Sequence, residues 1–91
     1  MEVKVRNELD TLLRMVTAWR DDKIRMAGGE DGWDFLVGDL AGEIEEHVYP
    51  YVRRMCECKY ITAEEQGGFL DQCFAHVRLL AEHLQPVAEE T

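Results

Sequence analysis

Apolar residues recur at helical spacing along three stretches of the chain, and no stretch alternates apolar and polar residues as a strand does. The first stretch predicts a helix over residues 3–27. Its apolar seam consists of Val5, Leu9, Leu12, Val16, Trp19 and Met26, and Leu13 and Ile24 widen it. Lys23 interrupts the seam, and Gly28-Gly29 allows the left-handed backbone that closes a final helical turn.

The second stretch predicts a long amphipathic helix over residues 32–58, with Asp31 as its N-cap and Asp34 in a capping-box position. Projection at about 100° per residue gathers its apolar side chains in one arc roughly 160° wide, which we expect to face the core. The arc holds Trp33, Leu36, Val37, Leu40, Ala41, Ile44, Val48, Tyr51, Val52, Met55 and Cys58. Pro50 cannot donate to the carbonyl of Glu46, so we expect the helix to be kinked at Pro50, or broken there to give a fourth short helix.

A capping box from Thr62 to Glu65 opens the third stretch and predicts a helix over residues 62–85. Gly67-Gly68 weakens the first turn, so we expect the regular helix to settle only from Phe69. The core arc contains Phe69, Leu70, Cys73, Phe74, Val77, Leu80, Ala81 and Leu84. Pro86 stops the helix and begins a tail, residues 86–91, that we expect to be frayed.

Three helices of similar length with short connections predict an all-α fold, an antiparallel up-down-up three-helix bundle that forms a single domain over residues 1–91. A chain of this length can form a modest core, but it is short for an enzyme with a deep, walled cleft. Because each helix carries a wide apolar arc, a second copy can also complete a larger bundle. The sequence therefore leaves monomer and homodimer open.

The charge balance and the composition limit the possible functions. The formal charge is −9 at pH 7, and 46% of the residues are hydrophobic, which is typical of a folded chain. An acidic chain is unsuited to direct nucleic-acid binding, which needs clustered Lys and Arg. Apolar runs are too short for a membrane span, and charged residues interrupt any leader-like run near the start. Together with an odd number of cysteines, 3, these features favour a cytoplasmic location.

The cysteines form one candidate metal site. Cys56-x-Cys58 and Cys73-x-x-His76 contain the Cys₃His set of a structural zinc site. A hairpin between the second and third helices, however, separates Cys58 from Cys73 by roughly 12 Å. Both of these cysteines also project into apolar arcs, where cysteine behaves as a small hydrophobic residue. Cys56 is therefore the expected exposed thiol.

Glu43, His47 and His76 form a second candidate metal set, but they lack the paired Glu-x-x-His motifs of di-iron bundles. The chain contains no serine, no nucleophile elbow and no glycine-rich phosphate loop. We therefore expect no enzymatic activity, no bound metal and no cofactor.

Three surfaces are candidates for binding a partner. The first, the glycine notch, is Phe35, Gly38, Gly42 and Tyr49 on the side of the second helix away from the core arc. Each interior glycine costs about 1 kcal/mol against alanine, so the glycines are either merely tolerated or allow another chain to approach closely. The second surface is a polar seam of Gln72, His76, Leu79 and His83, whose affinity for a partner helix would fall below pH about 6.5. The third is an acidic patch of Asp39, Glu43 and Glu46.

These features predict a small acidic interaction protein that forms a homodimer or binds another protein. One alternative is an acidic nucleic-acid mimic or inhibitor that docks on a basic protein site through the acidic patch. A second alternative is a small metal-binding helical protein that uses its Cys and His residues. High salt separates the first two functions, because it weakens mimicry but leaves apolar association intact.

Overall fold

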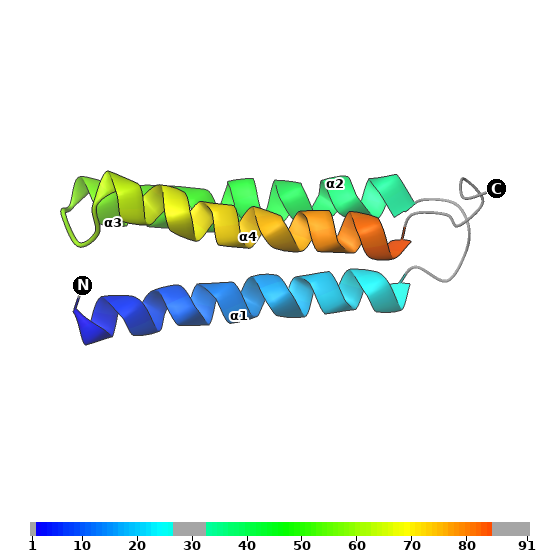
Figure 1. Ribbon diagram of the computed structural model, residues 1–91, viewed down its shortest axis with the longest axis horizontal. Helices are drawn as coiled ribbons and strands as arrows, with labels where there is room; N and C mark the ends of the chain where they lie inside the picture. Colours follow the sequence, from blue (N-terminus) through cyan, green and yellow to red (C-terminus); the bar gives the residue numbers. More distant parts are fainter. Residues whose placement is uncertain (1, 27–32, 85–91) are drawn as a thin grey trace.

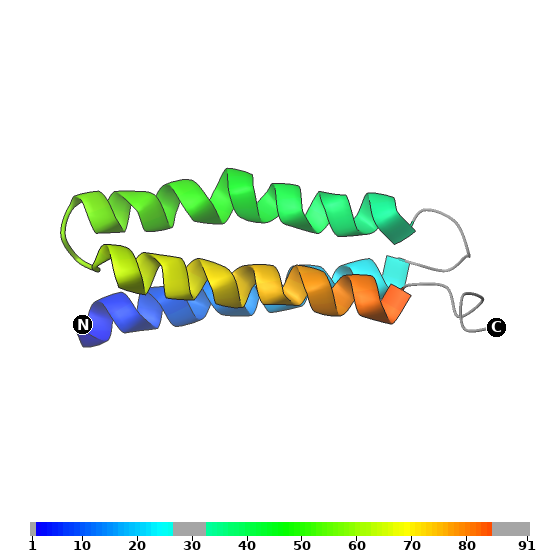
Figure 2. The ribbon, with the colours of Figure 1, turned by 45° about the horizontal axis from the view of Figure 1, so that its top comes forward.

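The computed structural model describes residues 2–26 and 33–84, and the elements within them are all helical (Figure 1). They are α1 (Val3–Met26), α2 (Trp33–Glu43), a π-helical turn η1 (Ile44–Val48), α3 (Tyr49–Glu57) and α4 (Ala63–Leu84). α2, η1 and α3 follow one another without a loop and together form the middle helix (Figure 2). The middle helix runs antiparallel to α1 and α4, which confirms the predicted up-down-up three-helix bundle.

The bundle is long and narrow, measuring 49 × 21 × 19 Å, because its helices lie side by side along most of their length (Figures 1 and 2). Several predictions fall outside the described residues. They are the caps at Gly28-Gly29 and Asp31, the side chains of Trp33 and Asp34, and the tail over residues 86–91.

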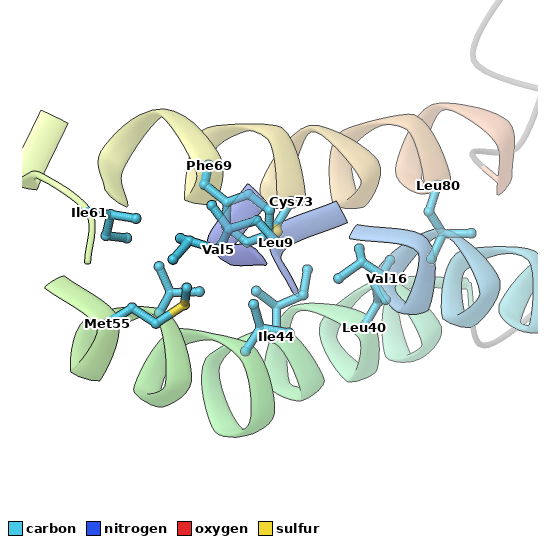
Figure 3. Close-up of a cluster of buried hydrophobic side chains, with 12 residues drawn as sticks. Val5, Leu9, Val16, Leu40, Ile44, Met55, Ile61, Phe69, Cys73 and Leu80 are labelled. Atoms are coloured by element: carbon cyan, nitrogen blue, oxygen red, sulfur yellow. The ribbon is translucent and has the colours of Figure 1, made fainter. Parts of the chain in front are cut away.

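The core is an apolar column between the three helices, and Figure 3 shows its side chains pointing toward one another. Its buried members are Val5, Leu9 and Val16 of α1, Leu40, Ile44, Val48, Val52 and Met55 of the middle helix, and Phe69, Cys73 and Leu80 of α4. All of these follow the predicted arcs. Ile61, in the predicted connection, is buried as well. Met26 is 64% exposed because it ends α1, so its predicted place in the apolar seam is wrong.

The middle helix buries one residue every four positions, at Leu36, Leu40, Ile44, Val48 and Val52. A regular α-helix turns by about 400° over four residues, so a stripe with this spacing would drift by about 40° per step and about 160° in all. η1 reduces the drift, because a π-helical turn holds one residue more than an α-helical turn and so cancels about 100°. The stripe therefore keeps facing the other two helices.

The interruption predicted at Pro50 takes the form of this π-helical turn, which ends just before the proline. Tyr49 donates its backbone N–H to the carbonyl of Ile44, the bond that characterises a π-helix. Pro50 follows as the second residue of α3 and has no N–H to donate. The wider turn before it gives the proline ring room beside the preceding carbonyls, so the helical path continues directly into α3.

The π-helical turn also changes which side chains of α3 face the core. Each later residue is rotated by about 100° from its place in a regular α-helix. Tyr51 and Cys58, both predicted to lie in the core arc, are exposed, Tyr51 by 47%. Cys56, predicted to be the exposed thiol, is half-buried and packs against the core. These three predictions are wrong for one and the same reason.

A Schellman turn ends the middle helix. The N–H of Lys59 donates to the carbonyl of Cys56, and the N–H of Tyr60 donates to the carbonyl of Met55, both at 2.9 Å. Lys59 has a φ of 68°, the left-handed conformation that glycine usually supplies at this position. A lysine here places some strain in the connection, because its Cβ lies close to the following carbonyl.

The predicted capping box at the start of α4 is confirmed. The N–H of Thr62 donates to Oε1 of Glu65 at 2.9 Å, and the N–H of Glu65 donates to Oγ1 of Thr62 at 3.0 Å. α4 is helical from Ala63 onward, through Gly67-Gly68. The prediction that the glycines delay the regular helix to Phe69 is therefore wrong, because the capping box satisfies the N-terminal backbone groups of the first turn.

Candidate functional site

The glycine notch is divided by the π-helical turn. Phe35 is 71% exposed, and no described atom from outside the local helix lies within 4 Å of the place that a Cβ would take on Gly38 or Gly42. Tyr49 follows the turn and is rotated by about 100° away from the face that carries the glycines. Packing within the described chain therefore gives no reason for glycine at these two positions.

The polar seam of α4 lies partly against α1. Nδ1 of His76 is 2.9 Å from Nη1 of Arg20, and since a guanidinium only donates, Nδ1 accepts this hydrogen bond. Burial lowers the pKa of His76, and the charge of Arg20 lowers it further. Gln72, Leu79 and His83 are exposed. His76 is thus a contact within the chain, between α1 and α4.

The acidic patch is partly neutralised by a buried lysine. Lys23 is only 6% exposed, and its Nζ donates to Oδ2 of Asp39 at 2.7 Å and to Oε2 of Glu43 at 3.4 Å. Burial by itself would lower the pKa of Lys23, but the hydrogen bonds and charges of the two carboxylates outweigh it and raise that pKa. Glu46 is exposed on η1. The patch therefore presents less negative charge to a basic partner than its three carboxylates alone would.

The candidate metal ligands are not brought together. Within residues 2–26 and 33–84, no three His, Cys, Asp or Glu side chains are grouped closely enough to hold a metal ion. The ring of His47 packs against Trp19 in an edge-on arrangement, with ring centroids 6.3 Å apart. Cys73 lies in the core, where burial raises the pKa of its thiol to about 11 and keeps it protonated at neutral pH.

A groove between α1 and α3 has no counterpart among the sequence predictions. It consists of two depressions with volumes of about 350 and 360 Å³. Lys4, Glu8 and Tyr51 line both and so mark its centre. Glu2, Val5, Arg54, Met55, Cys58 and Tyr60 complete the first depression, and Asn7, Thr11 and Leu12 complete the second. We call this feature the α1–α3 groove; it lies at the end of the bundle that holds the start of α1 (Figure 1).

The α1–α3 groove forms because α1 packs against α2 and α4 more closely than against α3. Tyr51, rotated out of the core by η1, reaches across the gap and donates its hydroxyl to Oε1 of Glu8 at 3.0 Å. This hydrogen bond raises the pKa of Tyr51, and desolvation adds to the effect. Val5 and Met55 are buried along the groove, whereas Tyr60 beside them is 57% exposed.

One signal in the sequence points to this site. Apolar residues recur at every fourth position from Leu36 to Val52, a spacing that drifts by about 40° per step on a regular α-helix and that a π-helical turn would straighten. Once that turn is placed, Tyr51 projects toward a flank of the helix and out of the core. The separation of α1 from α3 has no comparable signal, because it depends on how the helices pack.

Comparisons with protein-family models, with curated proteins and with solved structures gave no match. No helix in the described ranges is long and apolar enough to cross a lipid bilayer.

Proposed function

We propose that this chain is a small helical interaction protein that forms a homodimer through the α1–α3 groove. The observation that carries the proposal is a pair of exposed tyrosines, Tyr51 and Tyr60, beside an apolar floor of Val5 and Met55. Tyrosine and methionine are enriched at protein interfaces, and a tyrosine ring supplies a large contact area with few rotatable bonds. A partner side chain in the groove would remove these rings from water.

The other candidate surfaces have weaker support. His76 of the polar seam is already engaged with Arg20, and two of the three carboxylates of the acidic patch, Asp39 and Glu43, are engaged with Lys23. In the glycine notch, Tyr49 has turned away from Gly38 and Gly42, which leaves one aromatic ring beside the glycines. The α1–α3 groove combines two exposed aromatic rings and an apolar floor with an open depression.

A homodimer is compatible with the size of the chain. A stable interface buries about 800 Å² on each partner. The accessible surface of the chain is 6293 Å², so such an interface would cover about an eighth of it. α1 has 24 residues and is about 36 Å long, so one side of the bundle can supply this area.

Light scattering after size exclusion, with reduced protein at about 0.05 M and 1 M salt, tests the proposal. We expect a dimer at both salt concentrations, because the contact is mainly apolar. Tyr51→Ser and Tyr60→Ser should each weaken the dimer by about tenfold or more, since truncation of a central aromatic contact removes much of the binding energy. Tyr51→Phe, which keeps the ring but not the hydroxyl, should retain the dimer.

Tyr49→Ser is the matched control, because Tyr49 is an exposed tyrosine of the same helix that does not line the groove. It should leave the dimer intact. A wild-type protein that remains monomeric at every concentration would reject self-association. A dimer that Tyr49→Ser weakens more than Tyr51→Ser would place the contact on another face of the middle helix.

A further inference from the structure

The α1–α3 groove is electrically balanced, although the chain is strongly acidic. Its two depressions are lined by two cations, Lys4 and Arg54, and two carboxylates, Glu2 and Glu8. The other lining residues carry no formal charge at neutral pH, whereas the whole chain carries −9. A second acidic copy therefore meets little net repulsion at this groove. A basic partner, by contrast, would gain more from the acidic surface elsewhere.

The charges at the centre of the groove have a self-complementary order. Lys4 and Glu8 are one helical turn apart on α1, both are exposed, and both line both depressions. Lys4 forms no ion pair with any described residue, and Glu8 uses one oxygen to accept from Tyr51. A cation and a carboxylate oxygen are thus both available to a partner, one turn apart.

We infer that the occupant of the α1–α3 groove is the same groove of a second copy, related by a two-fold axis that passes between Lys4 and Glu8. In a two-fold interface, if one residue contacts a second, the second also contacts the first on the other copy. Two antiparallel α1 helices then set Lys4 of each copy against Glu8 of the other. The exposed rings of Tyr51 and Tyr60 would be enclosed beside these pairs. This inference rests on the proposed homodimer and specifies its geometry.

Charge reversal with complementation tests this geometry. Lys4→Glu places carboxylates opposite each other, and Glu8→Lys places ammonium groups opposite each other, so each variant alone should weaken the homodimer by about tenfold or more. An equimolar mixture of the two variants restores both pairs across the axis. We expect the mixture to form a heterodimer with an affinity within about threefold of wild type, observed by native mass spectrometry and sedimentation.

Arg14→Glu is the matched control, because Arg14 is exposed on α1 and does not line the groove. The substitution changes the net charge by the same amount as Lys4→Glu. It should leave the dimer unchanged, and circular dichroism should show folded protein for every variant. A wild-type dimer whose affinity neither reversal changes would overturn the two-fold geometry while leaving self-association intact. The two-fold geometry would also be overturned if the mixture of the two variants failed to associate, or if Arg14→Glu weakened the homodimer as much as Lys4→Glu does. A monomeric wild type would reject the homodimer itself.

Discussion

α4 and the middle helix bury similar apolar side chains at different spacings. α4 buries Phe69, Cys73 and Leu80, positions that fall on one face of a regular α-helix. The middle helix buries a residue at every fourth position from Leu36 to Val52, and it needs the π-helical turn to keep them on one face. As a result, the arc predicted for α4 matches the structure. In the arc predicted for the middle helix, Val52 and Met55 stay buried after the turn, but Tyr51 and Cys58 are exposed.

This difference shows that projection onto a regular α-helix predicts which side chains are buried only as far as the helix stays regular. Up to Ile44 the middle helix buries the residues that a regular helix would bury. Beyond η1, one additional residue has rotated the rest of the helix by about 100°, which moves Tyr51 and Cys58 out of the core and Cys56 toward it. The exposure of Tyr51 in the proposed interface is therefore a consequence of the π-helical turn.

The largest expected difference between the middle helix and α4 is in the stability lost when one residue is deleted from each. In a Pro50→Ala background, deletion of Glu46 should convert η1 into an α-helical turn and leave all later residues on their present faces, with a loss of less than about 1 kcal/mol. Deletion of Arg78 should rotate Leu80 out of the core and cost about 2–5 kcal/mol, as truncation of a buried leucine does. Urea unfolding followed by circular dichroism measures both losses.

Thiol labelling supplies the control for the two deletions. In the Glu46 deletion, Cys58 should stay reactive and Cys73 protected, because the faces are preserved. Equal losses of stability for the two deletions would contradict the conclusion that η1 sets the orientation of α3.

Replacing the glycines of each helix with alanine tests whether the two helices differ in their contacts. A Cβ would meet nothing within 4 Å at Gly38, Gly42, Gly67 or Gly68, so each substitution should stabilise the folded chain by about 1 kcal/mol. Thermal unfolding of the Gly38→Ala/Gly42→Ala and Gly67→Ala/Gly68→Ala proteins checks this. Neither pair should change the mass measured by light scattering. Weaker association in the Gly38→Ala/Gly42→Ala protein alone would assign the contact to the glycine notch instead of the groove.

A single glycine substitution in the connection between the middle helix and α4 should stabilise the folded chain. Lys59→Gly should raise the free energy of unfolding by about 0.5–1 kcal/mol, because glycine adopts the left-handed conformation at φ 68° without steric strain. Lys59→Ala keeps the Cβ and should give no such gain. Urea unfolding of both variants makes the comparison, and a loss of stability in Lys59→Gly would show that the lysine side chain stabilises the turn.

The smallest expected effect is a pH dependence that comes from α4. The pKa of His76 is lowered in the folded chain by burial and by Arg20, with Asp21 acting in the opposite direction. The unfolded chain therefore binds more protons, and the contribution of His76 to stability is present above pH about 6.5 and is lost as the pH falls through the lowered pKa. His76→Gln should lose less stability than wild type between pH about 7.5 and 5.5 in urea unfolding.

His83→Gln, on an exposed part of the same helix, should keep the wild-type dependence on pH. An unchanged dependence in His76→Gln would show that another group is responsible for it.

The sequence by itself determined the helical class, the order of the helices and most of the core. These follow from local rules, because apolar periodicity and capping residues act within a few turns of one helix, as the confirmed capping box of Thr62 and Glu65 illustrates. Only the tertiary structure decided which side chains of α3 are exposed, that Lys23 pairs with Asp39 and Glu43, and that α1 leaves a groove beside α3. These features depend on the relative rotation and distance of whole helices, which are set by the best packing of all three helices together.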